Sequence, residues 1–441
     1  MHGMSRQQGG TALKKVLQNQ AALLLAVNGL YLLASVLAGT FLNVYLWKNR
    51  QDFAMIGWFT VAQQLAVGLS FWLGGKWVKE HNKMNALRAG IAVSGFFYLL
   101  VLMIGGGVTH YIWPLGLILG VSTGLFWLAY NIVYFEISDA GNRDFFNGWM
   151  GLLGSFTGII GPWISGWLIS WLHGERGYRV VFIISLCIYG AAAALSFFLK
   201  KRKNQDAYLW LEPWRELRRA GSRWRPVTAA LLFQGLREGV FSFLIGLLVY
   251  IAAKEESKLG QYTLITSGVS LVSYWAAGKW FKPRHRTAGM LLGGLLLVAV
   301  VTPLLWKVGY GTLLVMGIGT SLFIPLYMLP MVSTSFDLMG VSEESAGKRV
   351  ELVVLRELSL MSGRLAGLLV FIAVLSVSQS PRVITLLLLV LGTAPLGSWL
   401  ILRKELKGTG DHPASSVQNK QINGKSPVDS GSSAPKQADQ R

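Results

Sequence analysis

The sequence predicts an all-α integral membrane protein. Hydrophobic residues make up 52% of the 441 residues and charged residues only 14%, against about 25% charged residues in a typical soluble domain. The apolar stretches are long and continuous, as expected for helices that need about 20 apolar residues to cross the hydrocarbon layer. Strands of a membrane barrel would instead alternate over about 10 residues. Most of the molecular surface should therefore face lipid.

Twelve membrane spans are expected, and only the seventh and the eleventh contain several charges. The spans lie near residues 20–46, 53–75, 87–108, 111–135, 145–172, 180–199, 226–252, 259–278, 287–306, 308–336, 350–377 and 383–402. They predict an N-terminal cytoplasmic segment (1–19), a six-helix bundle (20–199), a basic cytoplasmic linker (200–225), a second six-helix bundle (226–404) and a disordered cytoplasmic tail (405–441).

Basic residues are concentrated in one set of loops, which predicts the orientation. With the N-terminus inside, the inside segments hold most of the Lys and Arg residues, in line with the positive-inside rule. Both termini should therefore be cytoplasmic in a multi-pass protein of the plasma (inner) membrane. The same bias explains the net charge of +20, so no nucleic-acid partner is expected. The first apolar run is long enough to span, so it is expected to be a first helix rather than a removed leader.

The linker carries Trp210, Trp214 and Trp224 among many basic residues. It is compatible with a plain positive-inside connection or with an amphipathic helix that lies on the membrane surface.

Patterns typical of enzymes and cofactor sites are missing from the sequence. It contains no Gly-x-x-x-x-Gly-Lys-Ser/Thr loop, no Cys/His cluster and no arrangement for nucleophilic catalysis. The single cysteine, Cys187, cannot form an internal disulfide. We therefore expect no enzyme activity, no cofactor and no metal, and a monomer that handles a small-molecule substrate within a lipid bilayer.

An internal repeat relates the two halves of the chain. Gly75-Lys76-Trp77-Val78-Lys79 follows the second span, and Gly278-Lys279-Trp280-Phe281-Lys282 follows the eighth. Weaker matches occur in the same order elsewhere, including Tyr130 in the fourth span and Tyr327 in the tenth. Two parallel six-helix repeats around a central cavity are therefore predicted, related by an axis along the membrane normal.

These features resemble the major facilitator superfamily of transporters, over roughly residues 20–404. Its turn motif has the form Gly-x-x-x-Asp-Arg-x-Gly-Arg-Arg, and this sequence keeps the spacing from Gly75 to Lys83. Lys79 replaces the acid and Asn82 replaces the second glycine. The resemblance implies a secondary transporter that works by alternating access, with spans one, four, seven and ten around the cavity.

The fifth span contains Gly158, Gly161, Pro162 and Gly166 in a stretch similar to the Gly-Pro-x-x-Gly-Gly motif of the superfamily's exporters. This similarity implies export of drugs or other small molecules. Close helix packing through small residues would explain the same pattern.

Charged residues are predicted deep in two spans. Arg237 and Glu238 lie near the middle of the seventh span, and Glu357 and Arg364 lie well inside the eleventh, which also carries Arg356. A charge at the centre of a membrane helix costs roughly 2.5–3.5 kcal/mol on insertion scales. Glu238 and Glu357 are candidate proton carriers, and the arginines could hold an anionic substrate or tune the acids. Structural pairing between helices is the alternative.

A cytoplasmic gate is expected near the two glycine-basic turns. In the superfamily, the acid of the turn faces the start of the eleventh helix. Here the two charges could be exchanged, so that the basic Lys79 of the turn pairs with the acidic Glu351 near the surface. By symmetry, Lys282 would pair with Asp144. The candidate gate residues are Gly75, Lys79, Lys83, Asp144, Gly278, Lys282 and Glu351.

Polar and aromatic residues of the helices expected around the cavity are candidates for substrate contact. Ordinary helix packing is the alternative for the aromatic stripe of the fourth span. The candidates are Asn28, Tyr31, Trp127, Tyr130, Asn131, Tyr134, Arg237, Tyr327 and Arg364.

The sequence therefore predicts proton-coupled export of a small amphipathic molecule. Two alternatives stay open. A transporter-like scaffold or sensor would fit the altered turn, and a passive or sugar-type facilitator would fit the fold but not the charges near the membrane centre.

Overall fold

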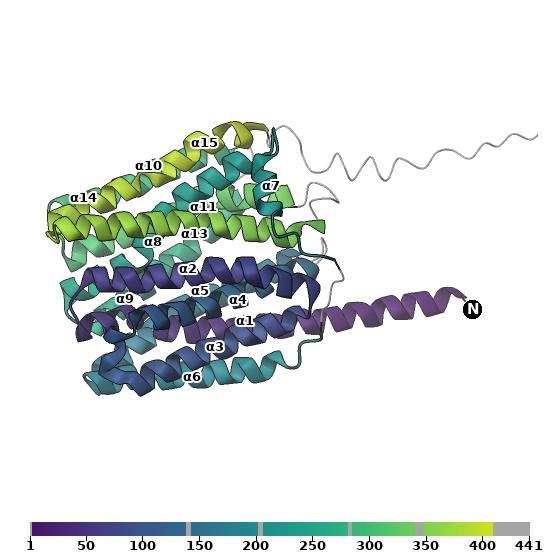
Figure 1. The fold of residues 1–441 in the computed structure, drawn as a ribbon, viewed down its shortest axis with the longest axis horizontal. Coiled ribbons are helices and arrows are strands. Elements are labelled where there is room, and N and C mark those ends of the chain that lie inside the picture. The colour runs from purple at the N-terminus through teal and green to yellow at the C-terminus, as the bar shows by residue number, and fades with distance from the viewer. Residues whose placement is uncertain (1, 138–142, 202–205, 281–284, 340–346, 409–441) are drawn as a thin grey trace, which may run out of the picture.

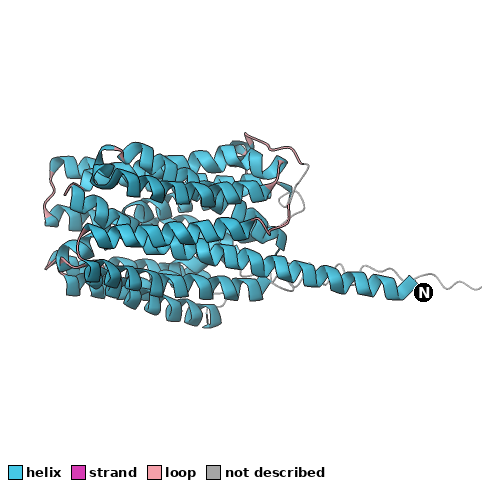
Figure 2. Ribbon diagram, turned by 90° about the horizontal axis from the view of Figure 1, so that it is seen from below, coloured by secondary structure: helices cyan, strands magenta, loops and turns pink. Residues whose placement is uncertain are grey.

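The computed structural model describes residues 2–137, 143–201, 206–280, 285–339 and 347–408. The described part of the chain is built from helices joined by short loops, without strands (Figure 2). The helices are α1 (His2–Asn49), α2 (Phe53–Glu80), α3 (Lys83–Ile104), η1 (Gly105–His110), α4 (Ile112–Ile137), α5 (Arg143–Leu172), α6 (Glu175–Ser196), α7 (Glu212–Arg218), α8 (Trp224–Ala253), α9 (Glu256–Trp280), α10 (Arg286–Ala299), η3 (Thr302–Leu305), α11 (Tyr310–Met339), α13 (Arg349–Val377), α14 (Pro381–Gly392) and α15 (Ala394–Gly408).

Eleven of the described helical segments are long and apolar enough to cross a membrane. The eighth expected span, α9, has 25 residues but a more polar sequence, so it is not one of the eleven. The last expected span is divided into α14 and α15 at Thr393, because Pro395 lacks the N–H that a continuous helix would use. The predicted fold class is therefore confirmed, with the number of spans close to the expected twelve.

Helix α1 begins well before the predicted first span. It starts at His2 and continues through the residues that were expected to form a separate N-terminal segment. Ala, Leu, Lys and Gln are frequent between residues 12 and 25, and these residues favour a helix even outside the hydrocarbon layer.

Local capping explains where two helices of the first half begin. The Asp52 side chain accepts hydrogen bonds from the backbone N–H groups of Ala54 and Met55 at the start of α2. Asn82 does the same for the N–H of Met84 at the start of α3. Asn82 stands where the resembling motif has glycine, so this departure supplies a helix cap.

The helices form two groups that lie side by side with their axes roughly parallel (Figure 1). Helices α1 to α6 form one half, and α8 to α15 form the other. The halves meet mainly where α2 packs against α13 and where α5 packs against α9. The N-terminal extension of α1 and the linker helix α7 lie at the same end of the bundle, here called the linker end; the other end is called the far end.

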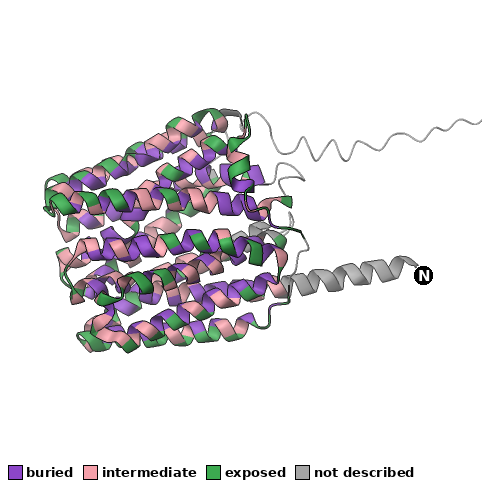
Figure 3. Ribbon diagram, in the orientation of Figure 1, coloured by how far each residue is buried: buried purple, intermediate pink, exposed green. Residues whose placement is uncertain are grey.

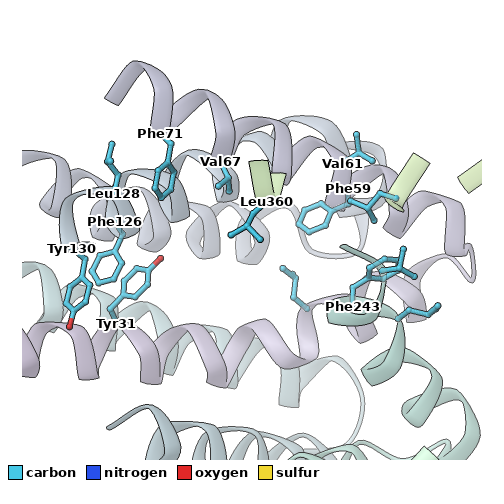
Figure 4. Packing of buried hydrophobic residues seen from close by; sticks show 14 of the residues in the cluster. Tyr31, Phe59, Val61, Val67, Phe71, Phe126, Leu128, Tyr130, Phe243 and Leu360 are labelled. Carbon is cyan, nitrogen blue, oxygen red and sulfur yellow. The ribbon is translucent and has the colours of Figure 1, made fainter. Parts of the chain in front are cut away.

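Exposed residues lie on the outer faces of the helices (Figure 3). Many of them are large and apolar, as expected for a surface that faces lipid. Buried residues lie between the helices. In the first half, the ring of Tyr31 stacks on Phe126 with centroids 3.4 Å apart, and Phe126 stacks on Tyr130 at 5.9 Å (Figure 4). This aromatic column fixes α1 against α4.

Candidate substrate cavity

A cavity of about 860 Å³ lies between the two halves. This volume is in the usual range for small-molecule sites. Helices α2 and α4 contribute an uncharged polar and aromatic wall, whereas α8 and α13 contribute all of the ionised lining residues. The residues considered below are Gln63, Gln64, Trp127 and Asn131 on the first wall, and Arg237, Glu238, Arg356, Glu357 and Arg364 on the second.

Glycines bring the charged wall together. Gly235 and Gly239 of α8 lie against the backbone of α13, and Gly363 lies against the backbone of α8 at Leu232. A side chain at either Gly235 or Gly363 would overlap the neighbouring backbone. This close approach, typical of small-residue contacts in membranes, places Glu238 of α8 beside Arg364 of α13.

Arg364 holds both carboxylates of the cavity. Its Nη2 lies 3.0 Å from Oε2 of Glu238, and its Nη1 lies 2.9 Å from Oε1 of Glu357. Glu238 also accepts a hydrogen bond of 2.6 Å from Nε2 of Gln234. On the facing wall, Oε1 of Gln64 lies 3.5 Å from Nη1 of Arg364. The network therefore reaches across the boundary between the halves.

Arg237 is held differently. Its side chain is only 6% exposed, and its guanidinium carbon lies 4.4 Å from the ring centre of Phe241. Its Nε and Nη2 atoms have no hydrogen-bond partner among the described residues. Arg356 packs over Phe336 at 5.6 Å, and its Nη1 lies 3.9 Å from Glu357. The wall thus contains three guanidinium groups but only two carboxylates.

Several residues expected to contact substrate do not line this cavity. Tyr31 and Tyr130 are buried in the aromatic column described above. Asn28 is also buried, and its Nδ2 lies 3.3 Å from the sulfur of Met150, which the Tyr130 hydroxyl also contacts. The prediction failed for these residues because it assigned whole helices to the cavity, whereas each helix turns only one face toward it.

Two other aromatic candidates also lie outside the main cavity. Tyr327 lines a smaller adjoining cavity of about 240 Å³ with Arg237 and Glu238, and its hydroxyl lies 3.0 Å from that of Ser398. Tyr134 is half-buried at the end of α4 and is not a lining residue. By contrast, Trp127 and Asn131, which lie one helical turn apart, do line the main cavity, and their contact with substrate stays a prediction.

Sequence reasoning missed Gln63 and Gln64, which line the cavity from α2. Two adjacent amides in an otherwise apolar span were the available signal. No group of three or more His, Cys, Asp or Glu side chains suited to a metal ion occurs among the described residues.

The expected contact between Lys79 and Glu351 is present at the linker end. Nζ of Lys79 lies 2.6 Å from Oε1 of Glu351, and the two side chains are 4% and 0% exposed. Glu351 was expected near the surface and is instead fully buried, because the linker covers it: the N–H of Leu209 donates to the same oxygen at 3.1 Å. The role of this pair as a gate stays a prediction.

The other gate candidates are arranged less symmetrically. Lys83 is buried and pairs with Glu136 within the first half. Gly75 packs against the ring of Tyr208, whereas Gly278 is exposed with open space around it. Lys282 and the side chain of Asp144 lie outside the described residues.

The linker packs on the protein at this end. The Trp72 indole donates to the carbonyl of Trp210 at 3.4 Å, and Lys348 pairs with Glu212 of α7 at 2.7 Å. Burial, and then the negative charge of Glu351, raise the pKa of the Tyr208 hydroxyl. The linker contains the short helix α7, which packs against α13 and α8. Its expected position on the membrane surface stays a prediction.

A second ion pair joins the halves at the far end. Nζ of Lys48 in α1 lies 2.9 Å from Oε1 of Glu256 in α9, which also accepts a hydrogen bond of 2.9 Å from the hydroxyl of Tyr178. The Lys48 side chain is 38% exposed and that of Glu256 is 12% exposed. Sequence reasoning missed this contact, since both charges lie at the ends of expected spans.

The glycine-proline stretch of α5 packs against both halves. Gly161 lies against α1 at Val36 and Leu37. Gly166 lies against the carbonyl of Glu256 and against Gly260, which in turn packs on the carbonyl of Pro162. Gly158 lies at ordinary contact distance from Ser267 of α9.

Comparisons with known proteins identify one family and two sequence relatives. The profile described as "Major Facilitator Superfamily" matches residues 23–342. The chain is 37% identical over 369 residues to an uncharacterized protein, YqgE, of Bacillus subtilis (strain 168), which covers 84% of this chain and 86% of that protein. It is 38% identical over 183 residues to an uncharacterized protein of Geobacillus stearothermophilus, which covers 42% of this chain and 86% of that protein.

Solved structures share the fold at low sequence identity. The human organic anion transporter MFSD10 (TETRAN) superposes with a TM-score of 0.62 at 14% identity, covering 88% of this chain and 99% of that chain. A bacterial homologue of the iron transporter ferroportin gives a TM-score of 0.59 in its outward-facing state and 0.62 in its inward-facing state, both at 15% identity. These matches cover 87% and 88% of this chain, and 98% and 99% of those chains.

Proposed function

Because the chain belongs to the major facilitator superfamily of membrane transporters, we propose that it exports a small amphipathic molecule by proton-coupled alternating access. The observation that carries the coupling proposal is the contact of one arginine, Arg364, with two carboxylates, Glu238 and Glu357, in the cavity between the halves. Ionised groups at this depth cost free energy in the membrane, and they are typically retained where they serve transport or pair with one another.

Protonation of either acid would change the contacts of Arg364. A neutral Glu238 or Glu357 attracts the guanidinium less, so Arg364 can shift toward its remaining partners. One of these is Gln64 of the other half. A proton bound in the second half can therefore alter a contact with the first half, which is what coupling to alternating access requires.

The ion pairs at the two ends fit the gates of such a cycle. Lys79–Glu351 closes the linker end, and Lys48–Glu256 closes the far end. We propose that the linker end is cytoplasmic, in a monomer that spans the plasma (inner) membrane many times. Export rests on the α5 motif, whose glycines pack at the boundary along which the halves would move.

A cavity of about 860 Å³ argues against a scaffold or sensor that never transports, for which a collapsed cavity is expected. The pairing of the turn residue Lys79 with Glu351 removes the main reason for that alternative. A passive facilitator would need neither Glu238 nor Glu357 in the cavity. Proton coupling is therefore the function that the geometry supports best.

Transport in proteoliposomes tests the proposal. Ethidium and naphthalene sulfonate would serve as a cationic and an anionic amphipathic probe, each with and without a proton gradient. We expect the gradient to accelerate movement of one of them by the wild type, and Glu238→Gln and Glu357→Gln to lose this acceleration. Glu175→Gln, at an exposed position, should behave as the wild type. Unchanged coupling in both cavity variants would reject the proposal.

A further inference from the structure

We infer that the cavity binds an organic anion, with Arg237 as the main contact for its charge and Arg356 as a second contact. The inference rests on the proposed function only in treating this cavity as the substrate site. It begins from the balance of charge on the lining: three guanidinium groups face two carboxylates. One positive charge is therefore in excess.

The excess charge is located on Arg237. Both carboxylates are within 3.0 Å of Arg364, and Glu357 has a longer contact with Arg356 as well. Arg237 and Glu238 are adjacent in α8, so their side chains leave the helix about 100° apart, and no ion pair joins them in the described part of the chain. The Arg237 cation is thus buried without an ion-pair partner among the described residues, with Glu238 close enough to attract it but in contact with Arg364 instead. This arrangement favours binding of an anion.

Arg237 also has free hydrogen-bonding capacity. Its Nε and Nη2 lack partners among the described residues, and its planar face is occupied by Phe241. Stacking fixes the plane of the guanidinium and leaves its N–H edge available, which is the arrangement that a carboxylate, sulfonate or phosphate accepts. Nε of Arg356, which lines the same cavity, also has no partner within the described residues.

The rest of the cavity fits an apolar body. Aromatic and aliphatic side chains alternate with amides and hydroxyls around the lining, so a ligand with one charged group and an aromatic or aliphatic body would satisfy both kinds of surface. The apolar lining residues include Phe71, Trp127, Phe241, Ile245, Met316 and Phe336.

For an anionic substrate, charge determines whether proton binding strengthens or weakens substrate binding. Protonation of Glu238 or Glu357 adds positive charge to the lining and strengthens anion binding, and by reciprocity the anion favours protonation. The titratable and charged groups that line the two cavities are Arg237, Glu238, Tyr262, Tyr274, Tyr327, Arg356, Glu357 and Arg364.

Binding of three probes of similar shape to the purified full chain tests the inference without any transport. Naphthalene sulfonate, naphthalene sulfonamide and naphthylmethylammonium differ mainly in charge. We expect the wild type to bind the sulfonate about tenfold more tightly than the sulfonamide, since a charge-assisted contact is replaced by a neutral one. Equal affinities, or tighter binding of the cation, would overturn the inference even if no variant could be purified.

Variants locate the contact. Arg237→Gln should lose the preference for the sulfonate, and Arg237→Lys should keep part of it. Arg403→Gln is the matched control, because Arg403 also stacks on an aromatic ring of its own helix, Trp399, but is exposed on α15. A preference that persists in Arg237→Gln would contradict the assignment. A wild type that prefers the sulfonate but shows no acceleration by a proton gradient would reject the proposed coupling and leave the anion site standing.

Discussion

The ion pairs at the two ends of the boundary differ in burial. At the linker end, Lys79 and Glu351 are almost completely buried, and the carboxylate also accepts the N–H of Leu209. At the far end, more than a third of the Lys48 side chain is exposed, although its partner Glu256 also binds Tyr178. The two contacts are of similar length but sit in different surroundings.

This difference indicates which end opens more easily. A pair with an exposed cation exchanges its contact for water at little cost, typically about 0–1 kcal/mol. Separating a buried pair leaves each charge without compensation, and removal of one partner from such a pair typically costs about 3–5 kcal/mol. The far end should therefore open first from the arrangement in this structure, with the linker end as the fixed side.

The largest effect is expected from Glu351→Gln. It leaves Lys79 buried without a countercharge and should lower the free energy of unfolding by about 3 kcal/mol, seen as a reduced thermal midpoint of the purified protein. The exchange Lys79→Glu with Glu351→Lys should recover part of the loss. Lys76→Met is the control, since Lys76 is half-exposed and has a long contact to Glu80. Equal losses in the variant and the control would show that burial of the pair is unimportant.

An intermediate effect is expected from Gly166→Val. The new side chain would meet the carbonyl of Glu256 and the backbone of Gly260, so α5 and α9 must separate near the far-end pair. Overpacking of this kind lowers the free energy of unfolding by roughly 1–3 kcal/mol. The rate of backbone hydrogen exchange should also rise at the start of α9. Gly151→Val on the same helix, where a side chain would meet open space, should change neither quantity. Faster exchange only at the linker end would contradict the comparison.

The smallest effect is expected from Lys48→Gln. Because Lys48 is partly exposed, the change should alter stability by less than about 1 kcal/mol, while hydrogen exchange of residues 50–56 should increase. High salt should reproduce this increase in the wild type, because it screens an exposed charge better than a buried one. Lys307→Gln, at an exposed lysine in the loop between η3 and α11, should have no such effect. If Lys48→Gln lowered the free energy of unfolding as much as Glu351→Gln does, the two ends would not differ in the strength of their ion pairs.

Features that follow from composition and spacing could be predicted from the sequence. Apolar runs and their duplication predicted the fold. The charges in the seventh and eleventh spans predicted a watery cavity or mutual pairing, and Glu238, Glu357 and Arg364 both line the cavity and pair with one another. The contact of Lys79 with Glu351 was predicted from the altered turn and is present in the structure. Each of these depends on a residue type that is rare in a membrane span and is therefore conspicuous.

The remaining features depend on which face of a helix meets which neighbour. Tyr31 and Tyr130 were expected in the cavity, but they stack with Phe126 in the first half. The far-end pair was missed because Lys48 resembles an ordinary interfacial lysine until α9 brings Glu256 to it. Helical period alone gives the faces of a helix but not their partners.

The hydrogen bond from Leu209 to Glu351 has a consequence for the segment that joins the halves. The same oxygen receives the ammonium of Lys79 from one half and a main-chain N–H of the connecting segment. Parting the halves at this end must therefore also break the contact of Leu209 with Glu351 or release residues 208–210 from α2, which holds the Tyr208 N–H and the Trp210 carbonyl. The tether would alternate between a docked and a released form once per turnover, so its length and stiffness would limit how wide the molecule can open there.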